Sequence, residues 1–400
     1  MSAINTVPEL VEGQGPGAPI QGVTLYSFTR AFHGREHDLE GLIRKVAAEG
    51  YGPGLEIIGF SSFRGFPQID DAFAGRFRDL VAETGLVTTS LAINADIGIH
   101  RDRLLNQDEL IEYMRRQIEA AAKLGFPIAR VQISIEPDSM EALAPVAEKY
   151  GVTLALEVHA DQYASHPRIL ALRDRYEKVG SPFLGFTMDW GATTVGFAPS
   201  LLEAYRRRGA SEDLLGKVVD LWNSYYEQGP PKDQQDHAQR MGSFIGLAAQ
   251  NGRPDLGIDF GINGTGLFGP ARVDDWLEII PWITHVHGKF FGIDEHGEEP
   301  SVPVRDLIRL LVENGYDGAV SSEYEGWHWN HWQSPFEIIA SEQKVQRAAA
   351  QEAGSRMVTD AAEARTQLTR WLRDGRSSSE PQASRDAETK PLPDTEGVPA

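Results

Sequence analysis

The chain has 400 residues, of which 41% are hydrophobic, and it carries a formal net charge of -20 with no cysteine. This length and apolar content suffice for one large α/β domain, and the missing cysteine excludes disulfides, thiol nucleophiles and thiolate metal ligands. The acidic balance argues against a nucleic-acid partner, because contacts to phosphate depend on lysine and arginine.

The start of the chain predicts no targeting segment. Residues 1–21 form an N-terminal extension without the basic-then-apolar order of a secretion signal. No apolar run in the chain approaches the roughly 20 residues that a membrane helix needs. We therefore expect a cytoplasmic protein with no membrane partner.

From residue 22 to about residue 350, apolar β-rich runs alternate with amphipathic segments. In the first amphipathic segment Leu39, Leu42, Ile43 and Val46 fall on one helical face. The eight candidate strands are 23–28, 54–59, 87–93, 129–134, 153–159, 184–189, 283–290 and 318–324, and glycines end six of the preceding helices, at Gly50, Gly85, Gly125, Gly151, Gly180 and Gly315. Eight such units predict an α/β fold, a (β/α)8 TIM barrel. The alternative, an open doubly wound sheet, lacks a glycine-rich fingerprint after its first strand.

The spacing breaks between the sixth and seventh strands, where an insertion covers about residues 200–280. It predicts helices at 214–229 and 236–252 and then a glycine-rich loop at 255–275. Such an insertion is typical of a lid or a subunit contact, and a spacer without a catalytic role is the alternative. After the barrel, 351–373 predicts a helix, and the polar, proline-rich segment 374–400 predicts a disordered tail.

Four ionisable residues each close an apolar run: Glu157, Asp189, His287 and Glu323. Residues two apart on a strand share a face, and in a barrel of this kind active sites lie at the carboxyl ends of the strands. Three carboxylates that converge there without a cation would repel one another and take up protons. The pattern therefore predicts a divalent metal site. Unrelated polar strand ends are the alternative.

Oxygen donors with one imidazole and no sulfur suit manganese or magnesium best, and zinc, cobalt and iron remain open. We expect Mn²⁺. The four ligand motifs, LEVH, MDWG, HVHGKF and SSEYEG, resemble the metal-binding pattern of the xylose isomerase-like barrel superfamily, which contains sugar isomerases and epimerases. The resemblance spans roughly residues 20 to 350, and it implies that the four residues are metal ligands.

More narrowly, the segments GVTLYSF, GYGPGLEIIGFSS and SSEYEGWHW are similar to the larger, catalytic subunit of bacterial C-glycoside deglycosidases. This resemblance implies a metal-dependent carbon-carbon lyase acting on a 3-oxo C-glycoside of an aromatic compound, with a small β subunit as partner. A keto-sugar isomerase or epimerase with the same metal chemistry is the alternative, and a non-catalytic sugar-binding barrel is a further one.

Other residues surround the predicted ligands. His159 shares the face of Glu157 and is either the general base or a residue that orients Glu157. Lys289 either stabilises an enolate oxygen or supplies a proton, or it pairs with the acidic cluster. Trp327, Trp329 and His328 predict stacking on a sugar or an aromatic group, and a plug over the barrel mouth or a subunit contact is the alternative. Glu56 predicts a substrate contact or a buried partner for an arginine.

Overall fold

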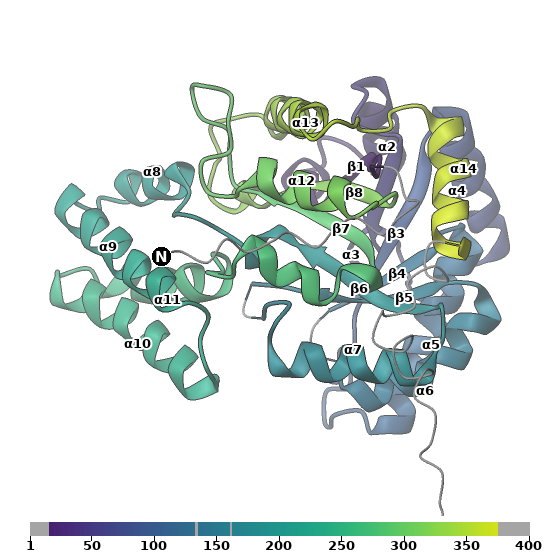
Figure 1. The fold of residues 1–400 in the computed structure, drawn as a ribbon, viewed down its shortest axis with the longest axis horizontal. Helices are drawn as coiled ribbons and strands as arrows, with labels where there is room; N and C mark the ends of the chain where they lie inside the picture. The colour runs from purple at the N-terminus through teal and green to yellow at the C-terminus, as the bar shows by residue number, and fades with distance from the viewer. Residues whose placement is uncertain (1–15, 133–134, 161, 375–400) are drawn as a thin grey trace, which may run out of the picture.

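Eight parallel strands close into one barrel in chain order, which confirms the predicted TIM barrel (Figure 1). The computed structural model describes residues 16–132, 135–160 and 162–374. The strands are β1 Ile20–Thr24, β2 Gly54–Ile58, β3 Val87–Ile93, β4 Ile128–Val131, β5 Thr153–Val158, β6 Leu184–Asp189, β7 Ile283–Phe290 and β8 Ala319–Tyr324. Most of the predicted extension at 1–21 and, beyond Asp374, the predicted disordered tail lie outside the described residues.

Helices surround the barrel, and none of those described has both the length and the apolarity to cross a membrane. They are α1 Thr29–His33, α2 Leu39–Ala48, α3 Gly59–Ser62, α4 Asp71–Thr84, α5 Gln107–Leu124, α6 Pro137–Tyr150, α7 Pro167–Val179, α8 Pro199–Arg207, α9 Glu212–Gln228, α10 Gln234–Gln250, α11 Gly257–Gly266, α12 Val304–Glu313, α13 Pro335–Glu352 and α14 Ala361–Asp374. The six glycines expected at helix ends all have φ between 65° and 86°, the left-handed conformation in which a side chain is strained.

The first strand differs from its predicted bounds. It begins at Ile20 and ends at Thr24, and the next residues form the short 3-10 helix η1, Leu25–Phe28. The Thr24 hydroxyl accepts a hydrogen bond from the Tyr26 backbone N–H (3.3 Å), and the Ser27 hydroxyl donates to the carbonyl of Ser322 on β8 (3.1 Å). The local bond from Tyr26 to Thr24 competes with the strand ladder, and the long-range bond from Ser27 ties the turn to β8.

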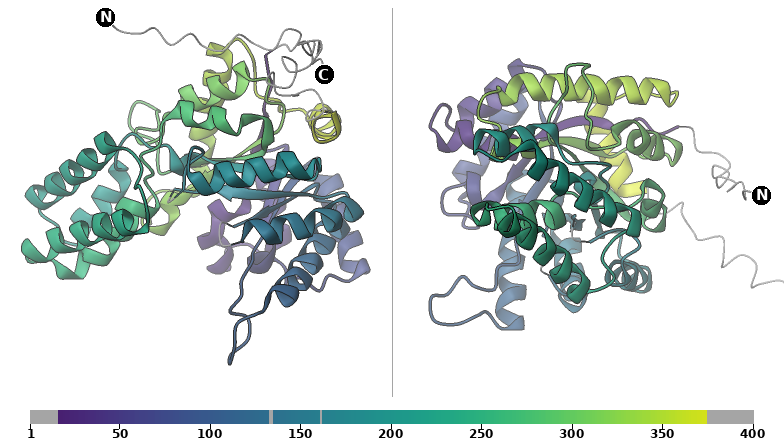
Figure 2. Two further views of the ribbon diagram at one scale, coloured as in Figure 1. Left: turned by 60° about the horizontal axis from the view of Figure 1, so that its bottom comes forward. Right: turned by 90° about the vertical axis from the view of Figure 1, so that its left-hand side faces the viewer.

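The insertion forms a separate helical lobe, α8 to α11, beside the barrel (Figures 1 and 2). The predicted helices correspond to α9 and α10, but the predicted glycine-rich loop contains the helix α11. The glycines are there because α10 and α11 pack closely: a Cβ on Gly264 would lie 2.7 Å from the ring of Phe244, and one on Gly261 would lie 3.0 Å from Met241. Tertiary packing has outweighed the poor helix propensity of glycine.

The segment predicted as one helix at 351–373 is divided. It holds the end of α13, an irregular stretch in which Val358 bridges to Ile20, and then α14. Ala364 and Leu368 of α14 are buried against Ile20 and other residues at the amino ends of the strands. This helix therefore covers the end of the barrel opposite the strand ends that carry the predicted ligands.

On the outside of β8, α13 holds a buried polar network. The Ser322 hydroxyl donates to Glu342 Oε2 (2.7 Å), and Gln343 donates to the carbonyls of Gly22 (3.1 Å) and Tyr51 (2.9 Å). Burial raises the pKa of the Glu342 carboxyl to about 8, so it is largely protonated at neutral pH. The network fixes β8 one residue before Glu323.

Glu342→Gln is expected to stabilise the fold at alkaline pH. An unfolded carboxyl titrates near its ordinary value of 4.5, so the native chain binds this proton more tightly and its stability falls as the pH rises from 4.5 to about 8. The neutral amide removes this loss, and the gain at pH 8 should be on the order of 4 kcal/mol. Thermal unfolding at pH 5 and pH 8 measures it, and an equal effect of the substitution at both values would contradict the assignment.

Candidate active site

The four strand-end residues lie together at the carboxyl end of the barrel. Glu157, Asp189, His287 and Glu323 come from β5, β6, β7 and β8, and each offers a ligand atom within 4.8 Å of the other three. These four residues are at most 5% exposed. Asp189 lies opposite His287 in the strand register, whereas Glu157 lies opposite Thr187 and Glu323 lies opposite Lys289.

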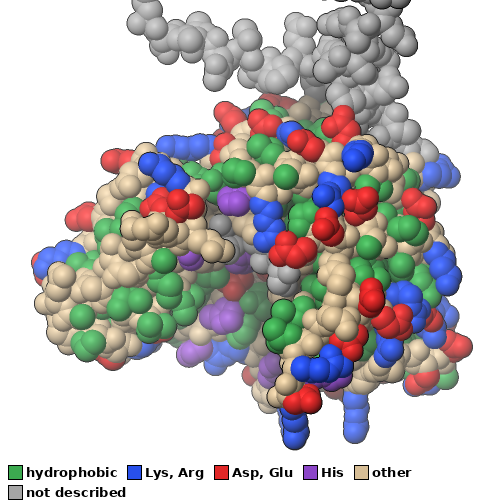
Figure 3. Space-filling view, turned by 90° about the horizontal axis from the view of Figure 1, so that it is seen from below, with side chains coloured by type: hydrophobic (Ala, Val, Ile, Leu, Met, Phe, Trp, Pro, Cys, Tyr) green, Lys and Arg blue, Asp and Glu red, His purple; other side chains and the backbone are tan. Residues whose placement is uncertain are grey.

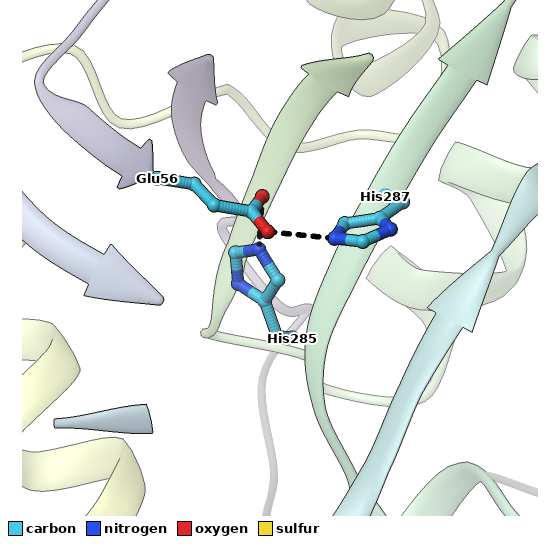
Figure 4. A group of neighbouring side chains, drawn as sticks. All are labelled: Glu56, His285 and His287. Carbon is cyan, nitrogen blue, oxygen red and sulfur yellow. Dashed lines mark hydrogen bonds and ion pairs between the residues drawn. The ribbon is translucent and has the colours of Figure 1, made fainter. Parts of the chain in front are cut away.

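One ring nitrogen of His287 faces the three carboxylates. Its Nδ1 is 2.7 Å from Glu157 Oε1, 3.5 Å from Glu323 Oε2 and 3.9 Å from Asp189 Oδ2. Its Nε2 lies 2.8 Å from Glu56 Oε1 on the other side (Figure 4). The ring is therefore held so that Nδ1 points into the cluster.

Glu56, predicted as a substrate contact or a buried partner for an arginine, lies behind His287, is completely buried and pairs with two histidines. Its second oxygen is 3.0 Å from His285 Nε2 (Figure 4). Burial opposes ionisation of Glu56, but attraction to His287 and His285 outweighs burial and lowers the pKa. The alternation of residues in β2 indicates that the Glu56 side chain points inward, but it cannot reveal that two histidines contact its carboxylate.

The cluster has an excess of negative charge. Burial raises the pKa of the Glu323 carboxyl to about 7, although His287 attracts its charged form, and repulsion from Asp189 adds to the rise. Glu323 Oε2 is buried and accepts no hydrogen bond, and the buried Asp189 Oδ2 is paired with the Lys289 ammonium. Buried carboxylate oxygens beside an imidazole nitrogen are the donor set that a divalent cation prefers.

Lys289 lies at the edge of the cluster and joins it to His159. Its Nζ is 2.9 Å from Asp189 Oδ2, 3.3 Å from Glu325 Oε2 and 3.0 Å from His159 Nε2. Burial lowers the pKa of Lys289, but attraction to Asp189 and the neighbouring carboxylates outweighs burial and holds the pKa well above its usual value. Because an ammonium group can only donate, His159 Nε2 accepts this hydrogen bond.

Sequence reasoning missed three residues of this network. Arg130 Nη1 lies 3.3 Å from Glu157 Oε2, and the arginine is 5% exposed. Glu325 pairs with Lys289 and accepts a hydrogen bond from the Tyr26 hydroxyl (2.9 Å). A charged residue within the apolar run at 129–131 could have indicated Arg130. The two-residue spacing between Glu323 and Glu325 could have indicated Glu325.

The aromatic segment after β8 forms the 3-10 helix η6, Glu325–His328, and the residues that follow it. Trp327 stacks on His328 with 3.8 Å between ring centroids and meets Tyr26 edge to face. Trp329 donates from Nε1 to the Ser200 hydroxyl of α8 (3.1 Å). His328 and Trp329 line a cavity of about 930 Å³ between this segment and the insertion, and Figure 3 shows the surface hollowed beside the insertion, with histidine side chains along the hollow.

Comparison with known proteins identifies the family. The model of the xylose isomerase-like TIM barrel matches residues 43–214. The chain is 86% identical to the C-glycoside deglycosidase alpha subunit of Microbacterium trichothecenolyticum, over 89% of this chain and 97% of that protein. It is 75% identical to an alpha subunit of the same name from Arthrobacter globiformis, over 89% of this chain and 97% of that protein. It is 47% identical to the 3'-dehydrocarminate deglycosidase alpha subunit of a Microbacterium species, over 82% of this chain and 94% of that protein. The chain therefore belongs to the family of C-glycoside deglycosidase alpha subunits.

Proposed function

We propose that this chain is the catalytic subunit of a divalent-metal-dependent lyase that cleaves the carbon-carbon bond of 3-oxo C-glycosides. The observation that carries the proposal is the buried cluster of Glu157, Asp189, His287 and Glu323 with the His159–Lys289 pair at its edge. The names of the relatives, which include a deglycosidase of a 3'-dehydro compound, support the substrate class.

The four clustered residues would hold the metal, with His287 contributing Nδ1. Mn²⁺ fits this set best, and Mg²⁺, Co²⁺ and Zn²⁺ are the alternatives. When bound, the ion would act as a Lewis acid that polarises the ketone and neighbouring hydroxyl oxygens of the sugar. Glu56 would orient His287 from behind, as carboxylates commonly do for metal-binding histidines.

His159 is proposed as the general base. The ketone at C3 of the sugar acidifies the hydrogen on C2, and His159 removes that proton to leave an enolate. The enolate electrons then form the C1–C2 double bond while the bond from C1 to the aglycone carbon breaks. That carbon keeps the electron pair and takes a proton, so the proton lost at C2 is balanced by the one gained on the aglycone.

Lys289 is proposed to assist the removal of the C2 proton from its position beside the cluster. Its ammonium group donates to His159 Nε2, and this hydrogen bond must break before the same lone pair accepts the proton from C2. The same positive charge lies close enough to the cluster to stabilise the negative charge that develops on the ketone oxygen. Lys289 therefore combines the two roles that the sequence left open, as a cation paired with carboxylates and as a group that assists the chemistry.

The proposal includes a partner. The relatives are named alpha subunits, which supports a complex with a smaller β subunit. Assays should therefore use the complete complex loaded with Mn²⁺.

The test separates the lyase from the isomerase or epimerase that the same residues would allow. The complex is incubated with a 3-oxo C-glucoside of a flavone and, separately, with keto-sugars, and the products are resolved by chromatography. Released flavone together with an unsaturated 3-keto sugar is expected. Epimerised or isomerised sugar without released flavone would contradict the lyase and favour the alternative.

A further inference from the structure

A large cavity lies between the insertion and the barrel, and the chemistry described so far uses only its edge. It measures about 930 Å³ and is bounded by α8, by α11 and by the segment after β8. The apolar and aromatic side chains that line it are Leu201, Tyr205, Ile262, Leu267, Trp329 and Trp332. Pockets for drug-sized molecules range from about 300 to 1,000 Å³ and are lined mainly by such side chains.

The cavity begins next to the four residues proposed as metal ligands. Glu325 lines it, and the carboxylate of Glu325 is 3.3 Å from Lys289 Nζ, which in turn is 2.9 Å from Asp189. A sugar held at the cluster would therefore have a substituent within reach of the cavity. Since the insertion follows β6, it rises from the same end of the barrel as the cluster.

The polar groups of the wall are largely engaged with one another. Arg208 forms an ion pair with Asp259, and Asn263 donates to the Tyr205 hydroxyl (2.7 Å). The guanidinium of Arg207 lies over the ring of Trp332, 4.1 Å from its centroid. A sugar requires many free hydrogen-bonding groups, whereas a flat aromatic molecule needs apolar faces.

Those apolar faces are open. Ile262 is 51% exposed, and Trp332 is 38% exposed although the Arg207 guanidinium covers part of its ring, so each still presents some apolar surface. An aromatic ring placed there would bury this surface and stack on an indole face, which is a favourable use of exposed aromatic side chains.

We infer that this cavity is the aglycone subsite: it takes the flat aromatic part of the substrate, and the insertion between β6 and β7 determines which aglycones are accepted. The inference rests on the proposed function, because it assumes a substrate with a sugar at the cluster. It assigns the insertion a substrate-binding role in place of a lid, a spacer or a subunit contact.

Two isoleucines on α11 provide a matched test. Ile262 lines the cavity, and Ile258, one turn earlier and 55% exposed, does not. Both residues are more than half exposed, so Ile262→Trp should intrude on the cavity and Ile258→Trp should not. Binding of unsubstituted flavone to the metal-loaded complex is measured by calorimetry for both variants and the wild type. We expect Ile262→Trp to weaken flavone binding at least tenfold and Ile258→Trp to leave it unchanged.

A kinetic comparison completes the test. Release of flavone from its 3-oxo C-glucoside is compared with hydrogen-deuterium exchange at C2 of 3-oxo-glucose, which has no aglycone. Ile262→Trp should lower kcat/KM for the first reaction at least ten times more than the second. Equal loss in both reactions, or unchanged flavone binding in Ile262→Trp, would overturn the subsite. A wild-type complex that binds flavone but catalyses neither reaction would instead contradict the proposed function.

Discussion

Glu157→Gln and Glu323→Gln are each expected to abolish turnover by removing the bound metal. Each substitution exchanges a charged oxygen donor for a neutral amide in a buried cluster whose negative charge needs a cation. Metal affinity should fall at least about 100-fold, since even residues that only support a metal ligand cost 10- to 100-fold. Elemental analysis of the purified complex measures the metal, and chromatography of released aglycone should show a loss of kcat/KM of roughly 10³-fold or more.

The control is Glu342→Gln. It changes a carboxyl that is just as deeply buried, but one that contacts Ser322 on the outer side of β8. This variant should keep both its metal and its activity. Full metal content in Glu157→Gln and Glu323→Gln would mean that these carboxylates are not ligands, and the central proposal would fail.

His159→Asn is expected to stop the reaction while the metal stays bound. The ring lies next to Lys289 at the edge of the cluster and is not one of the four clustered residues. Loss of a general base costs about 10²- to 10⁴-fold in rate. The exchange of deuterium into C2 of 3-oxo-glucose, followed by mass spectrometry, isolates the proton-transfer step from cleavage of the carbon-carbon bond.

Metal content distinguishes the two roles that the sequence allows for His159. A base that only transfers protons leaves the metal content of His159→Asn at the wild-type value, and C2 exchange is lost. If the variant loses metal in the way expected of Glu157→Gln, His159 acts by orienting Glu157. If C2 exchange continues at the wild-type rate with metal bound, another group is the base.

Local sequence patterns predicted the architecture because helix and strand formation depend on interactions between residues close in the sequence. The alternation of apolar runs and amphipathic segments identified the eight strands, and helix-ending glycines such as Gly151 and Gly180 are where the backbone needs a positive φ. The two-residue period of a strand also placed Glu157 and Asp189 on the inner face, and the order of strands in a barrel placed them close together.

Long-range contacts were harder to anticipate. Glu56 and His287 are far apart in the sequence, and only the closed barrel brings β2 and β7 into contact through their side chains. Arg130 reaches Glu157 from the neighbouring strand, and Glu325 reaches Lys289 from η6. Such pairings depend on which side chains fill the barrel, and the residue pattern within one strand does not predict them.

The insertion was also predicted only in part. Its existence and two of its helices follow from the sequence, but its glycine-rich part was predicted to be a loop and contains the helix α11. Packing of Gly261 and Gly264 against α10 supplies the stability that local propensity lacks. The barrel and the residues at the ends of its strands can be predicted from the chain alone, because strand period and helix ends are local properties. The way His287 is held and the position of the cavity beside the cluster follow only from the folded structure, because both depend on contacts between segments distant in the chain.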